Sequence, residues 1–257
     1  MTNICIAGAA GRMGRMIAAL AEAEGFSVTG ALEAPGLSCL GESYYGTAIT
    51  DDLGKALEGA RCVIDFALAK GIEKRVEAYA AQGIPAVIGT TGVDEEGLAA
   101  INKASEKIPV IHAANFSLGV NLLGALLEKA AAVLDESYDC EIVEMHHNKK
   151  KDAPSGTAIF LAGKVEEGRK AGREKEIFGR SGLTGERPKG EIAIHALRGG
   201  DVVGDHTVIF AAEGERVEFS HKAGSRANFA KGALRAARFL VGKKAGIYTM
   251  SDVIGLK

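Results

Sequence analysis

The stretch Asn3–Gly14, NICIAGAAGRMG, joins a short apolar run to three glycines at three-residue intervals. The apolar run predicts a buried β-strand, and the glycines predict a tight turn at which a helix begins. Backbone N–H groups in such a turn, together with the positive end of the helix dipole, bind a pyrophosphate. A plain strand-to-helix turn would explain the same glycines, and G-x-x-G-x-x-G is one residue off the commonest fingerprint. The position directly after the first strand favours a nicotinamide dinucleotide on Gly8–Gly14.

An acidic residue stands at the distance that a dinucleotide site requires. Glu33 ends the second predicted strand, roughly 20 residues beyond the third glycine, where a carboxylate accepts hydrogen bonds from the adenosine ribose. The alternative is a solvated strand end. A carboxylate repels a 2′-phosphate, and the following Ala34 and Pro35 supply no cation to offset the repulsion. We therefore expect NADH to be used at least as well as NADPH.

Two further segments follow strands of the same predicted sheet. They are Gly89–Gly92 (GTTG) and Ala113–Phe116 (AANF). Strand carboxyl ends line the cofactor crevice in doubly wound sheets, so both segments fall where the nicotinamide half is expected. Either could be only a turn.

Strands and helices alternate through the first half of the chain, which predicts a parallel, Rossmann-like sheet in an α/β fold. The stretch Ala34–Thr50 is rich in Gly and Ser, and it is predicted to be a long loop before a short helix near Asp52–Glu58. The other predicted helices are Arg12–Glu24, Lys70–Gln82 and Asp94–Ser105, the last capped by Asp94. The predicted strands are Asn3–Gly8, Ser27–Leu32, Arg61–Phe66, Ile84–Gly89 and Ile108–Ala113.

The pattern changes after Asn115. A helix capped by Ser117 and running to about Leu134 is expected, then a strand over Tyr138–His147, and a loop and helix within Lys149–Lys170. A mobile glycine-rich loop, Gly179–Gly190, precedes three closely spaced strands, Glu191–Arg198, His206–Ala212 and Arg216–His221. Strands without intervening helices indicate a second domain of α+β type with a mixed or antiparallel sheet.

The predicted helix Asn228–Leu240 has no core of its own, so it is expected to pack back onto the first domain. This division predicts a dinucleotide-binding domain of residues 1–116 plus 226–257. Residues 117–225 are then the substrate-binding and oligomerisation domain.

Composition argues against several classes of function. The 31 basic residues are matched by 33 acidic ones without a long basic run, which is untypical of a nucleic-acid partner. The sequence has no apolar run of about 18 residues and no signal-peptide pattern, so a cytoplasmic location without membrane contact is expected. The four cysteines form no C-x-x-C pair or metal-spaced cluster. We expect no metal, and buried, reduced thiols at Cys5, Cys62 and Cys140.

The densest polar segment is Glu144–Thr157, EMHHNKKKDAPSGT. Pro154 ends the preceding element, and Ser155 can cap a helix that begins with Gly156-Thr157. Exposed N–H groups at such a helix start bind carboxylates, and the neighbouring lysines and histidines add positive charge. This combination predicts a site for a substrate with more than one acidic group.

Plainer interpretations of this segment are a solvated lysine face and ordinary strand-end histidines. Zinc would need a third ligand at metal spacing, which the segment lacks. The remaining histidines, His112, His195, His206 and His221, have no comparable neighbours in sequence and are interpreted as structural.

Six segments in order resemble the family of 4-hydroxy-tetrahydrodipicolinate reductase, also called dihydrodipicolinate reductase. The resemblance covers essentially the whole chain, and its most specific part is H-H-x-x-K-x-D-A-P-S-G-T, matched from His146 to Thr157. The segments are GAAGRMG, GTTG, AANFSLGVN, EIVEMHHNKKKDAPSGTA, LRGGDVVGDHTVIFA and GERVEFSHKAGSR.

The resemblance implies a reductase of diaminopimelate and lysine biosynthesis, in which a cyclic dicarboxylate loses water and NAD(P)H delivers a hydride. It implies that His146 is a proton donor and acceptor, and that Lys150 is a proton donor. The implied substrate-binding residues are His147, Gly156 and Thr157, with Ser155 at the same helix start. The implied cofactor-binding residues are Gly8, Ala9, Ala10, Gly11, Arg12, Met13, Glu33, Gly89, Thr90, Thr91, Ala113, Ala114, Asn115 and Phe116.

The resemblance further implies a homotetramer assembled through the sheet of the second domain, and domain closure that brings nicotinamide to substrate. The chain departs from the family at Ala34, where some members carry an arginine for the 2′-phosphate. That departure puts a strong NADPH preference in doubt.

Two alternatives stay open from the residues. One is another Rossmann-fold amino-acid or semialdehyde dehydrogenase, which would explain the glycine turn but not the segment His146–Thr157. The other is a non-catalytic NAD-binding sensor, in which changes at His146 and Lys150 would affect stability alone.

Overall fold

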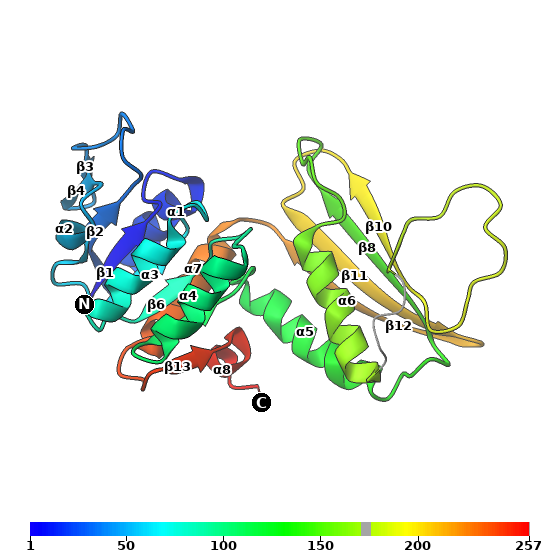
Figure 1. Ribbon diagram of the computed structural model, residues 1–257. Coiled ribbons are helices and arrows are strands. Elements are labelled where there is room, and N and C mark those ends of the chain that lie inside the picture. Colours follow the sequence, from blue (N-terminus) through cyan, green and yellow to red (C-terminus); the bar gives the residue numbers. More distant parts are fainter. Residues whose placement is uncertain (171–175, 257) are drawn as a thin grey trace. The chain divides into compact units, whose positions relative to one another are not determined.

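The computed structural model describes residues 1–170 and 176–256. The chain divides into two compact units. Unit 1 comprises Met1–Leu118 and the segment from Ala227 onward, and unit 2 comprises Gly119–Arg226. Both units combine helices with β-sheet (Figure 1). The α/β class is confirmed.

The sheet of unit 1 has the strand order β13-β7-β6-β5-β1-β2-β4-β3, parallel except at β3. The order reverses between β1 and β5, and ligands of doubly wound sheets bind at the carboxyl edge of such a switch point. The Rossmann-like prediction is confirmed. The strands are β1 Thr2–Ala7, β2 Phe26–Leu32, β3 Ser43–Tyr44, β4 Thr47–Thr50, β5 Cys62–Asp65, β6 Ala86–Ile88, β7 Pro109–His112 and β13 Gly246–Tyr248.

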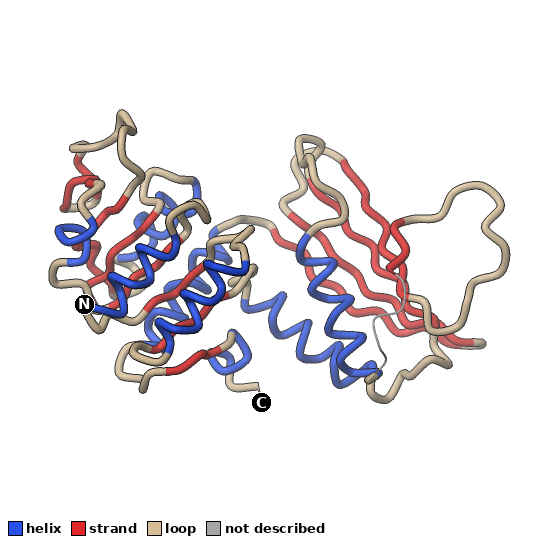
Figure 2. The backbone as a smooth tube through the Cα atoms, viewed as in Figure 1, coloured by secondary structure: helices blue, strands red, loops and turns tan. Residues whose placement is uncertain are grey.

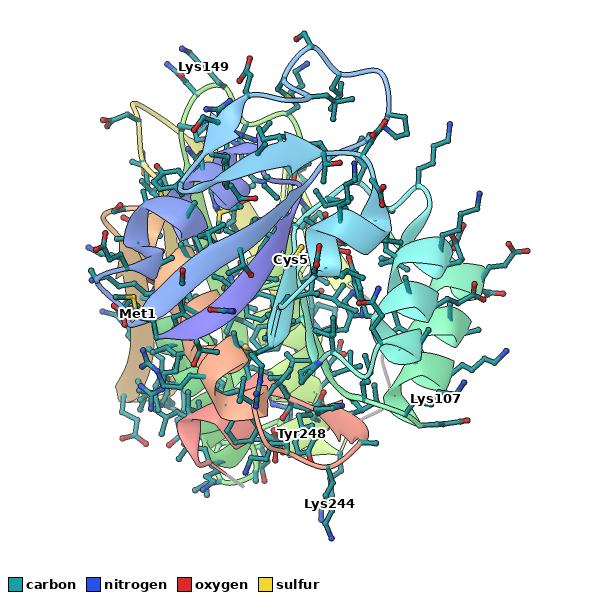
Figure 3. The ribbon with its side chains drawn as sticks, turned by 90° about the vertical axis from the view of Figure 1, so that its left-hand side faces the viewer. Met1, Cys5, Lys107, Lys149, Lys244 and Tyr248 are labelled. Atoms are coloured by element: carbon teal, nitrogen blue, oxygen red, sulfur yellow. The ribbon has the colours of Figure 1, made fainter. Side chains whose placement is uncertain are left out.

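Helices cover both faces of this sheet because alternate residues along each strand point to opposite sides. In β1, Ile4 and Ile6 enter one core cluster, whereas Cys5 and Ala7 enter the other. Figure 3 labels Cys5 within the sheet. The first cluster lies under α1 (Arg12–Ala21) and α7 (Ala227–Leu240). The second lies under α2 (Leu53–Leu57), α3 (Ile72–Ala81) and α4 (Glu95–Ser105), while α8 (Met250–Ile254) follows β13.

Helix α7 belongs to unit 1 although it follows unit 2 in the chain. Its residues Ala233, Leu234 and Ala237 are fully buried in the cluster that α1 also lines. Gly232 allows the closest contact, because a Cβ there would lie 1.7 Å from the carbonyl oxygen of Phe116. The prediction that this helix packs back onto the first domain is confirmed.

The prediction of a long loop over Ala34–Thr50 is confirmed for residues 34–42 and wrong for residues 43–50. Residues Ser43–Tyr44 and Thr47–Thr50 form β3 and β4, and β4 extends the sheet beside β2. Tyr45 and Gly46 connect them with positive φ angles of 44° and 94°. Such a two-residue turn is normally predicted from an Asn-Gly or Asp-Gly pair in the sequence. Tyr-Gly gives a weaker signal, and the strands are held by burial of Tyr44 and Ile49.

The sheet of unit 2 has the strand order β12-β11-β8-β10-β9. Strand β11 runs antiparallel to β8 and β12, whereas β10 runs parallel to β8 and β9. This is the predicted mixed sheet. Helices α5 (Leu118–Ala131) and α6 (Gly156–Arg169) cover one of its faces (Figure 2). The strands are β8 Asp139–His146, β9 Glu176–Phe178, β10 Ile192–Arg198, β11 Gly204–Ala212 and β12 Glu215–Ala223.

The glycine-rich segment Gly179–Gly190 carries two arginines that hold it against β8. Arg180 makes two hydrogen bonds to the carboxylate of Glu141, at 2.9 and 2.7 Å. Arg187 reaches the same carboxylate at 2.9 Å and the carboxylate of Asp139 at 2.8 Å. The segment forms the predicted loop, and these ion pairs fix it to β8 near its two ends.

Cys5, Cys62 and Cys140 are buried and free, as predicted. Within residues 1–170 and 176–256, no helix is long and apolar enough to cross a membrane.

Candidate active site

The glycine turn of unit 1 has the shape of a phosphate cradle. Gly8 has φ 77°, and a Cβ there would lie 2.8 Å from the backbone of Phe66 and Ala67, which follow β5. A Cβ on Gly14 would lie 2.2 Å from the carbonyl oxygen of Gly8. The turn therefore tolerates side chains at neither position, and it brings the start of α1 against the switch point.

The N-terminus of α1 is open toward a ligand. Its N-cap is the exposed Gly11, which has no side chain to cap the first N–H groups. The first helical turn contains no acidic residue. Unfilled N–H groups and the helix dipole favour an anion at this position, so the residues present fit a dinucleotide pyrophosphate. Around Gly11, Ala9 is buried, Ala10 and Met13 are half-buried and Arg12 is exposed.

Glu33, directly after β2, and Tyr44, in β3, bond the backbone of the glycine turn. Glu33 Oε1 accepts a hydrogen bond from the backbone N–H of Ala10 at 2.7 Å, and Oε2 accepts one from Ala34 at 3.3 Å. The buried Tyr44 hydroxyl donates to the carbonyl oxygen of Ala9 at 2.9 Å. Burial raises the pKa of Tyr44, and the hydroxyl therefore stays protonated. The Glu33 carboxylate thus lies directly beside the glycine turn, whereas sequence reasoning found no role for Tyr44.

Asp65, at the carboxyl end of β5, organises the segment Gly89–Gly92. Its carboxylate is fully buried and accepts hydrogen bonds from Arg75 Nε at 2.8 Å, the Tyr79 hydroxyl at 2.9 Å and the Thr90 hydroxyl at 3.1 Å. The N–H of Ala67 supplies a fourth donor at 3.0 Å. Thr90 consequently points its side chain into the protein. Only its backbone can face a cofactor, whereas Thr91 is exposed.

The segment Ala113–Phe116 continues β7 at the same edge of the sheet. Ala114 is exposed, while Ala113 and Asn115 are half-buried. The Asn115 side-chain oxygen accepts a hydrogen bond from Ser117 N at 2.8 Å. Phe116 is 1% exposed and packs on Phe66, with ring centroids 5.5 Å apart. Phe116 therefore supports this edge from the core.

In unit 2 a buried carboxylate, Glu144, connects the start of α6 with the end of β8. It is fully buried and accepts hydrogen bonds from His146 Nδ1 at 2.7 Å, Arg198 Nη1 at 2.9 Å and the backbone N–H of Ser155 at 3.1 Å. Burial opposes ionisation of Glu144, but the hydrogen bonds from Arg198 and His146 outweigh it and lower the pKa of the carboxyl. Glu144 is therefore a charged acceptor with its donors in place.

Lys150 differs from the lysines on either side of it. Its ammonium lies 2.6 Å from a carboxylate oxygen of Asp152, and its side chain is 17% exposed. Lys149 and Lys151 are exposed, and Figure 3 shows Lys149 projecting outward. Arg198 also donates to the carbonyl oxygen of Asp152 at 2.7 Å. Arg198 thus connects Asp152, which bonds Lys150, with Glu144, which bonds His146.

The helix start predicted at Ser155 is confirmed. Ser155 Oγ accepts a hydrogen bond from Ala158 N at 3.1 Å and lies 2.8 Å from His206 Nε2. The side chain of Ser155 is therefore committed to the cap and to His206. Gly156 is exposed at the first helical position, and Thr157 is half-buried beside it.

His206, which the sequence pattern interprets as structural, lies beside His146 in the structure. Its ring packs edge-on against the ring of His146, with centroids 5.2 Å apart, and it is 4% exposed. Burial, with a smaller contribution from the positive charge of His146, lowers the pKa of His206 to about 4. A neutral histidine therefore supports the His146 ring. His195, by contrast, bonds Glu141 at 2.6 Å.

Some of these partners were visible in the sequence and others were not. Glu144 lies two residues before His146 on the same strand, so both side chains point to one face of the sheet. Arg198 and His206 lie 54 and 51 residues away in sequence from the groups they contact. They reach the site only because β10 and β11 pair with β8.

The arrangement in unit 2 can hold an anion and move a proton. Exposed N–H groups at the start of α6 suit a carboxylate, and the ammonium of Lys150 and the ring of His146 provide cations or proton donors. His147 lies beside them, with its Nε2 3.5 Å from Arg226 Nη2.

Comparison with protein families covers both units. The family model described as dihydrodipicolinate reductase, N-terminus, matches residues 2–116, and the one described as dihydrodipicolinate reductase, C-terminus, matches residues 119–254. The chain belongs to the dihydrodipicolinate reductase family. Family members are NAD(P)H-dependent oxidoreductases, and the Rossmann-like sheet of unit 1 fits that cofactor class.

Curated members of the dihydrodipicolinate reductase family match over their full length. The 4-hydroxy-tetrahydrodipicolinate reductase of Thiobacillus denitrificans is 48% identical over 266 residues, covering 99% of each chain. The enzyme of the same name from Cupriavidus taiwanensis is 47% identical, covering 99% of this chain and 100% of its own.

Solved structures show the same fold. A dihydrodipicolinate reductase from Paenisporosarcina sp. TG-14, determined with dipicolinate bound, superimposes with a TM-score of 0.78 at 24% identity over 99% of both chains. Aspartate semialdehyde dehydrogenase II from Vibrio cholerae gives a TM-score of 0.56 at 11% identity, covering 94% of this chain and 98% of its own. Both likenesses concern the fold alone.

Proposed function

We propose that this chain reduces 4-hydroxy-tetrahydrodipicolinate, with loss of water, to tetrahydrodipicolinate in diaminopimelate and lysine biosynthesis. The observation that carries the assignment is the cluster at the end of β8. There, buried Glu144 bonds the ring of His146 at 2.7 Å and the first turn of α6 at 3.1 Å. One carboxylate thus connects the proposed proton-transfer residue to a helix start that suits a substrate carboxylate.

In unit 2, His146 is the proposed proton donor and acceptor and Lys150 a second proton donor. Gly156 and Thr157 are proposed to bind a substrate carboxylate through the N-terminus of α6, and His147 to bind the substrate beside them. Ser155 contributes by capping the helix, because its hydroxyl already bonds Ala158 and His206.

In unit 1, the turn from Gly8 to Met13 is proposed to hold the pyrophosphate of NADH or NADPH, which supplies the hydride. Glu33 is proposed to orient the adenosine ribose. The segments Gly89–Thr91 and Ala113–Phe116 are proposed to line the nicotinamide half through their backbones. Because Glu33 is a carboxylate and exposed Ala34 brings no cation, NADH is proposed to be used at least as well as NADPH.

The same reasoning extends to the domains. Residues 1–116 with 226–257 are proposed as the dinucleotide-binding domain, and residues 117–225 as the substrate-binding and oligomerisation domain of a homotetramer. A cytoplasmic location is proposed, because the buried free thiols suit a reducing compartment.

The test replaces the two proposed proton donors separately. His146→Gln and Lys150→Met are each expected to lower kcat roughly 10²-fold or more, the typical contribution of a positioned acid or base. NADH affinity is expected to stay within about twofold, since both residues belong to unit 2. The measurements are NADH oxidation in the presence of the dicarboxylate substrate and a binding titration with NADH.

Lys149→Met is the matched control, since this neighbouring lysine is exposed and is expected to leave kcat unchanged. A non-catalytic NAD-binding protein would bind NADH but show no substrate-dependent oxidation. That result, or full activity in His146→Gln, would contradict the proposal.

A further inference from the structure

We propose that Glu144 and Gly204 together fix which ring nitrogen of His146 exchanges the proton: Glu144 keeps the proton of Nδ1 in place, and Gly204 leaves Nε2 clear. Both are positioning residues, and no role follows for them from the sequence pattern alone. The inference rests on the proposed function of His146 as the proton donor and acceptor.

Glu144 determines the tautomer because an ionised carboxylate can only accept hydrogen bonds. Its Oε2 lies 2.7 Å from His146 Nδ1 and 2.9 Å from Arg198 Nη1, and its Oε1 accepts from Ser155 N. A neutral ring in this position must carry its proton on Nδ1, and its lone pair is then on Nε2. The fully buried carboxylate has no solvent to replace these donors.

The ring is also prevented from turning. The edge-on contact with His206 packs one side of it, and β8 and β10 hold its backbone, with Gly199 N donating to the His146 carbonyl oxygen at 2.9 Å. A rotation about the side chain would break the 2.7 Å bond to a buried charge. The ring orientation is therefore fixed, and Nε2 points in a single direction.

Gly204, the first residue of β11, lies at that Nε2 edge. A Cβ on Gly204 would lie 2.9 Å from Nε2 and 3.4 Å from Cδ2 of His146. Real Cβ atoms essentially never approach other atoms within 3.0 Å, so either the His146 ring or β11 would have to shift. Glu144 holds the ring, and β11 is paired on both sides with β8 and β12. Glycine at this position therefore keeps a β11 side chain away from Nε2.

The proton balance follows from this geometry. The imidazolium carries protons on both nitrogens, and the Nε2–H bond breaks when the proton passes to the substrate atom that gains negative charge after hydride delivery. The electron pair of that bond stays on Nε2. The neutral ring retains the proton on Nδ1, which stays hydrogen-bonded to Glu144. Solvent reprotonates Nε2 before the next turnover.

The direct test is the protonation state of the ring nitrogens in the full-length protein. Ring-¹⁵N-labelled histidine is incorporated, and the His146 signals are assigned by their loss in His146→Gln. At a pH where the ring is neutral, we expect a protonated Nδ1 and an unprotonated Nε2. In Glu144→Gln the side-chain amide can donate to Nδ1, so we expect the reverse. Protonated Nε2 in the native protein, or the same tautomer in both proteins, would overturn the inference.

Kinetics provides a second readout with a matched control on the same strand. Glu144→Gln is expected to lower kcat roughly 10²- to 10⁴-fold, as for other histidines left in the wrong tautomer, with NADH affinity within about twofold. Glu141 is also a carboxylate of β8 that bonds arginines and a histidine, namely Arg180, Arg187 and His195. Glu141→Gln removes a comparable ion cluster, and kcat is expected to stay within about threefold. Equal losses of kcat in the two variants would contradict the inference.

Gly204→Ala tests the Nε2 edge without removing a charge, and it remains informative if Glu144→Gln does not fold. It is expected to lower kcat at least about tenfold, while the Nδ1 proton stays in place. Gly224→Ala is the control, because a Cβ there meets nothing within 4 Å and kcat should be unchanged. Unchanged kcat in Gly204→Ala would overturn the role of Gly204. Because the tautomer is read without turnover, failure of the reductase assay would count against the proposed function and not against this inference.

Discussion

Two buried carboxylates, Asp65 in unit 1 and Glu144 in unit 2, organise the polar segments at the carboxyl ends of their strands. Each is fully buried and is surrounded by donors that include an arginine, Arg75 for Asp65 and Arg198 for Glu144. A buried charge is tolerated only when its acceptor positions are filled. Both residues therefore hold neighbouring loop segments in place, which explains why short polar segments can present their backbones in a defined direction.

The proposed cofactor preference rests on Glu33. Glu33→Ala removes the carboxylate that bonds Ala10 N at 2.7 Å, and it also removes a negative charge from the proposed adenosine site. We expect kcat/KM for NADH to fall about tenfold, the typical effect of losing a hydrogen bond to a charged group, and kcat/KM for NADPH to fall less. Steady-state rates with both cofactors give the ratio.

The control for Glu33 is Glu42→Ala, an exposed acidic residue of the following segment, which should leave the ratio unchanged. A native enzyme with much higher kcat/KM for NADPH would contradict the assignment of Glu33 and Ala34.

Acid sensitivity is predicted at His206. Its pKa is about 4 in the folded protein and about 6.5 in an ordinary environment, so the unfolded chain binds the additional proton between these values. The contribution of neutral His206 to the free energy of unfolding is fully present above about pH 6.5 and is lost as the pH falls toward 4. The slope for this group approaches roughly 1.4 kcal/mol per pH unit.

Urea unfolding midpoints between pH 7 and pH 5 measure the acid sensitivity of the native protein and of His206→Gln. The variant keeps a polar group that can reach Ser155 but does not titrate. A pH dependence as steep in His206→Gln as in the native protein would show that other groups cause it.

Among the elements, the hairpin of β3 and β4 has a function beyond extending the sheet. It places the Tyr44 hydroxyl 2.9 Å from the Ala9 carbonyl oxygen, in the middle of the glycine turn. Tyr44→Phe removes this donor and leaves a buried carbonyl without it, at a cost of about 1–2 kcal/mol. We expect a lower Tm and a several-fold weaker NADH affinity.

The neighbouring Tyr45→Phe is the matched control, because Tyr45 is 55% exposed and its change should affect neither Tm nor NADH affinity. Thermal unfolding and NADH titration of both variants give the comparison. Equal NADH affinity in Tyr44→Phe and the native protein would mean that the hairpin does not brace the turn.

For the whole molecule, the proposed tetramer needs a surface, and unit 2 has one sheet face that α5 and α6 leave uncovered. Leu197 on β10 is 49% exposed on that face, paired in register with Met145 of β8. Leu197→Glu places a charge there and is expected to shift the molar mass in solution from tetramer toward smaller species.

Light scattering after size-exclusion chromatography measures the molar mass. Leu98→Glu on α4, a residue of unit 1 that is 40% exposed, is the control and should keep the native mass. A monomeric native protein would contradict the tetramer, and an unchanged mass in Leu197→Glu would move the interface elsewhere.

Local sequence was sufficient for the elements whose signals are short in range. The run Asn3–Gly14 specifies strand, turn and helix because apolar alternation, glycine and helix periodicity act over a few residues. Asp94 and Ser155 were recognisable as caps for the same reason, since a capping side chain bonds the backbone three residues on. The hairpin at Tyr45-Gly46 could not be predicted in this way, because its stability comes from burial rather than from turn residues.

The residues around His146 include contacts that local sequence patterns cannot predict. The segment Glu144–Thr157 predicts an anion site by itself, and the proposed roles of His146 and Lys150 come from the family motif within it. The contacts of His206 and Arg198 depend on the pairing of β11 and β10 with β8, and strand pairing over 50 or more residues leaves no periodic trace in sequence. The glycine turn and the polar segment were thus readable from the chain itself, whereas the buried surroundings that select one ring nitrogen arise only when distant strands meet.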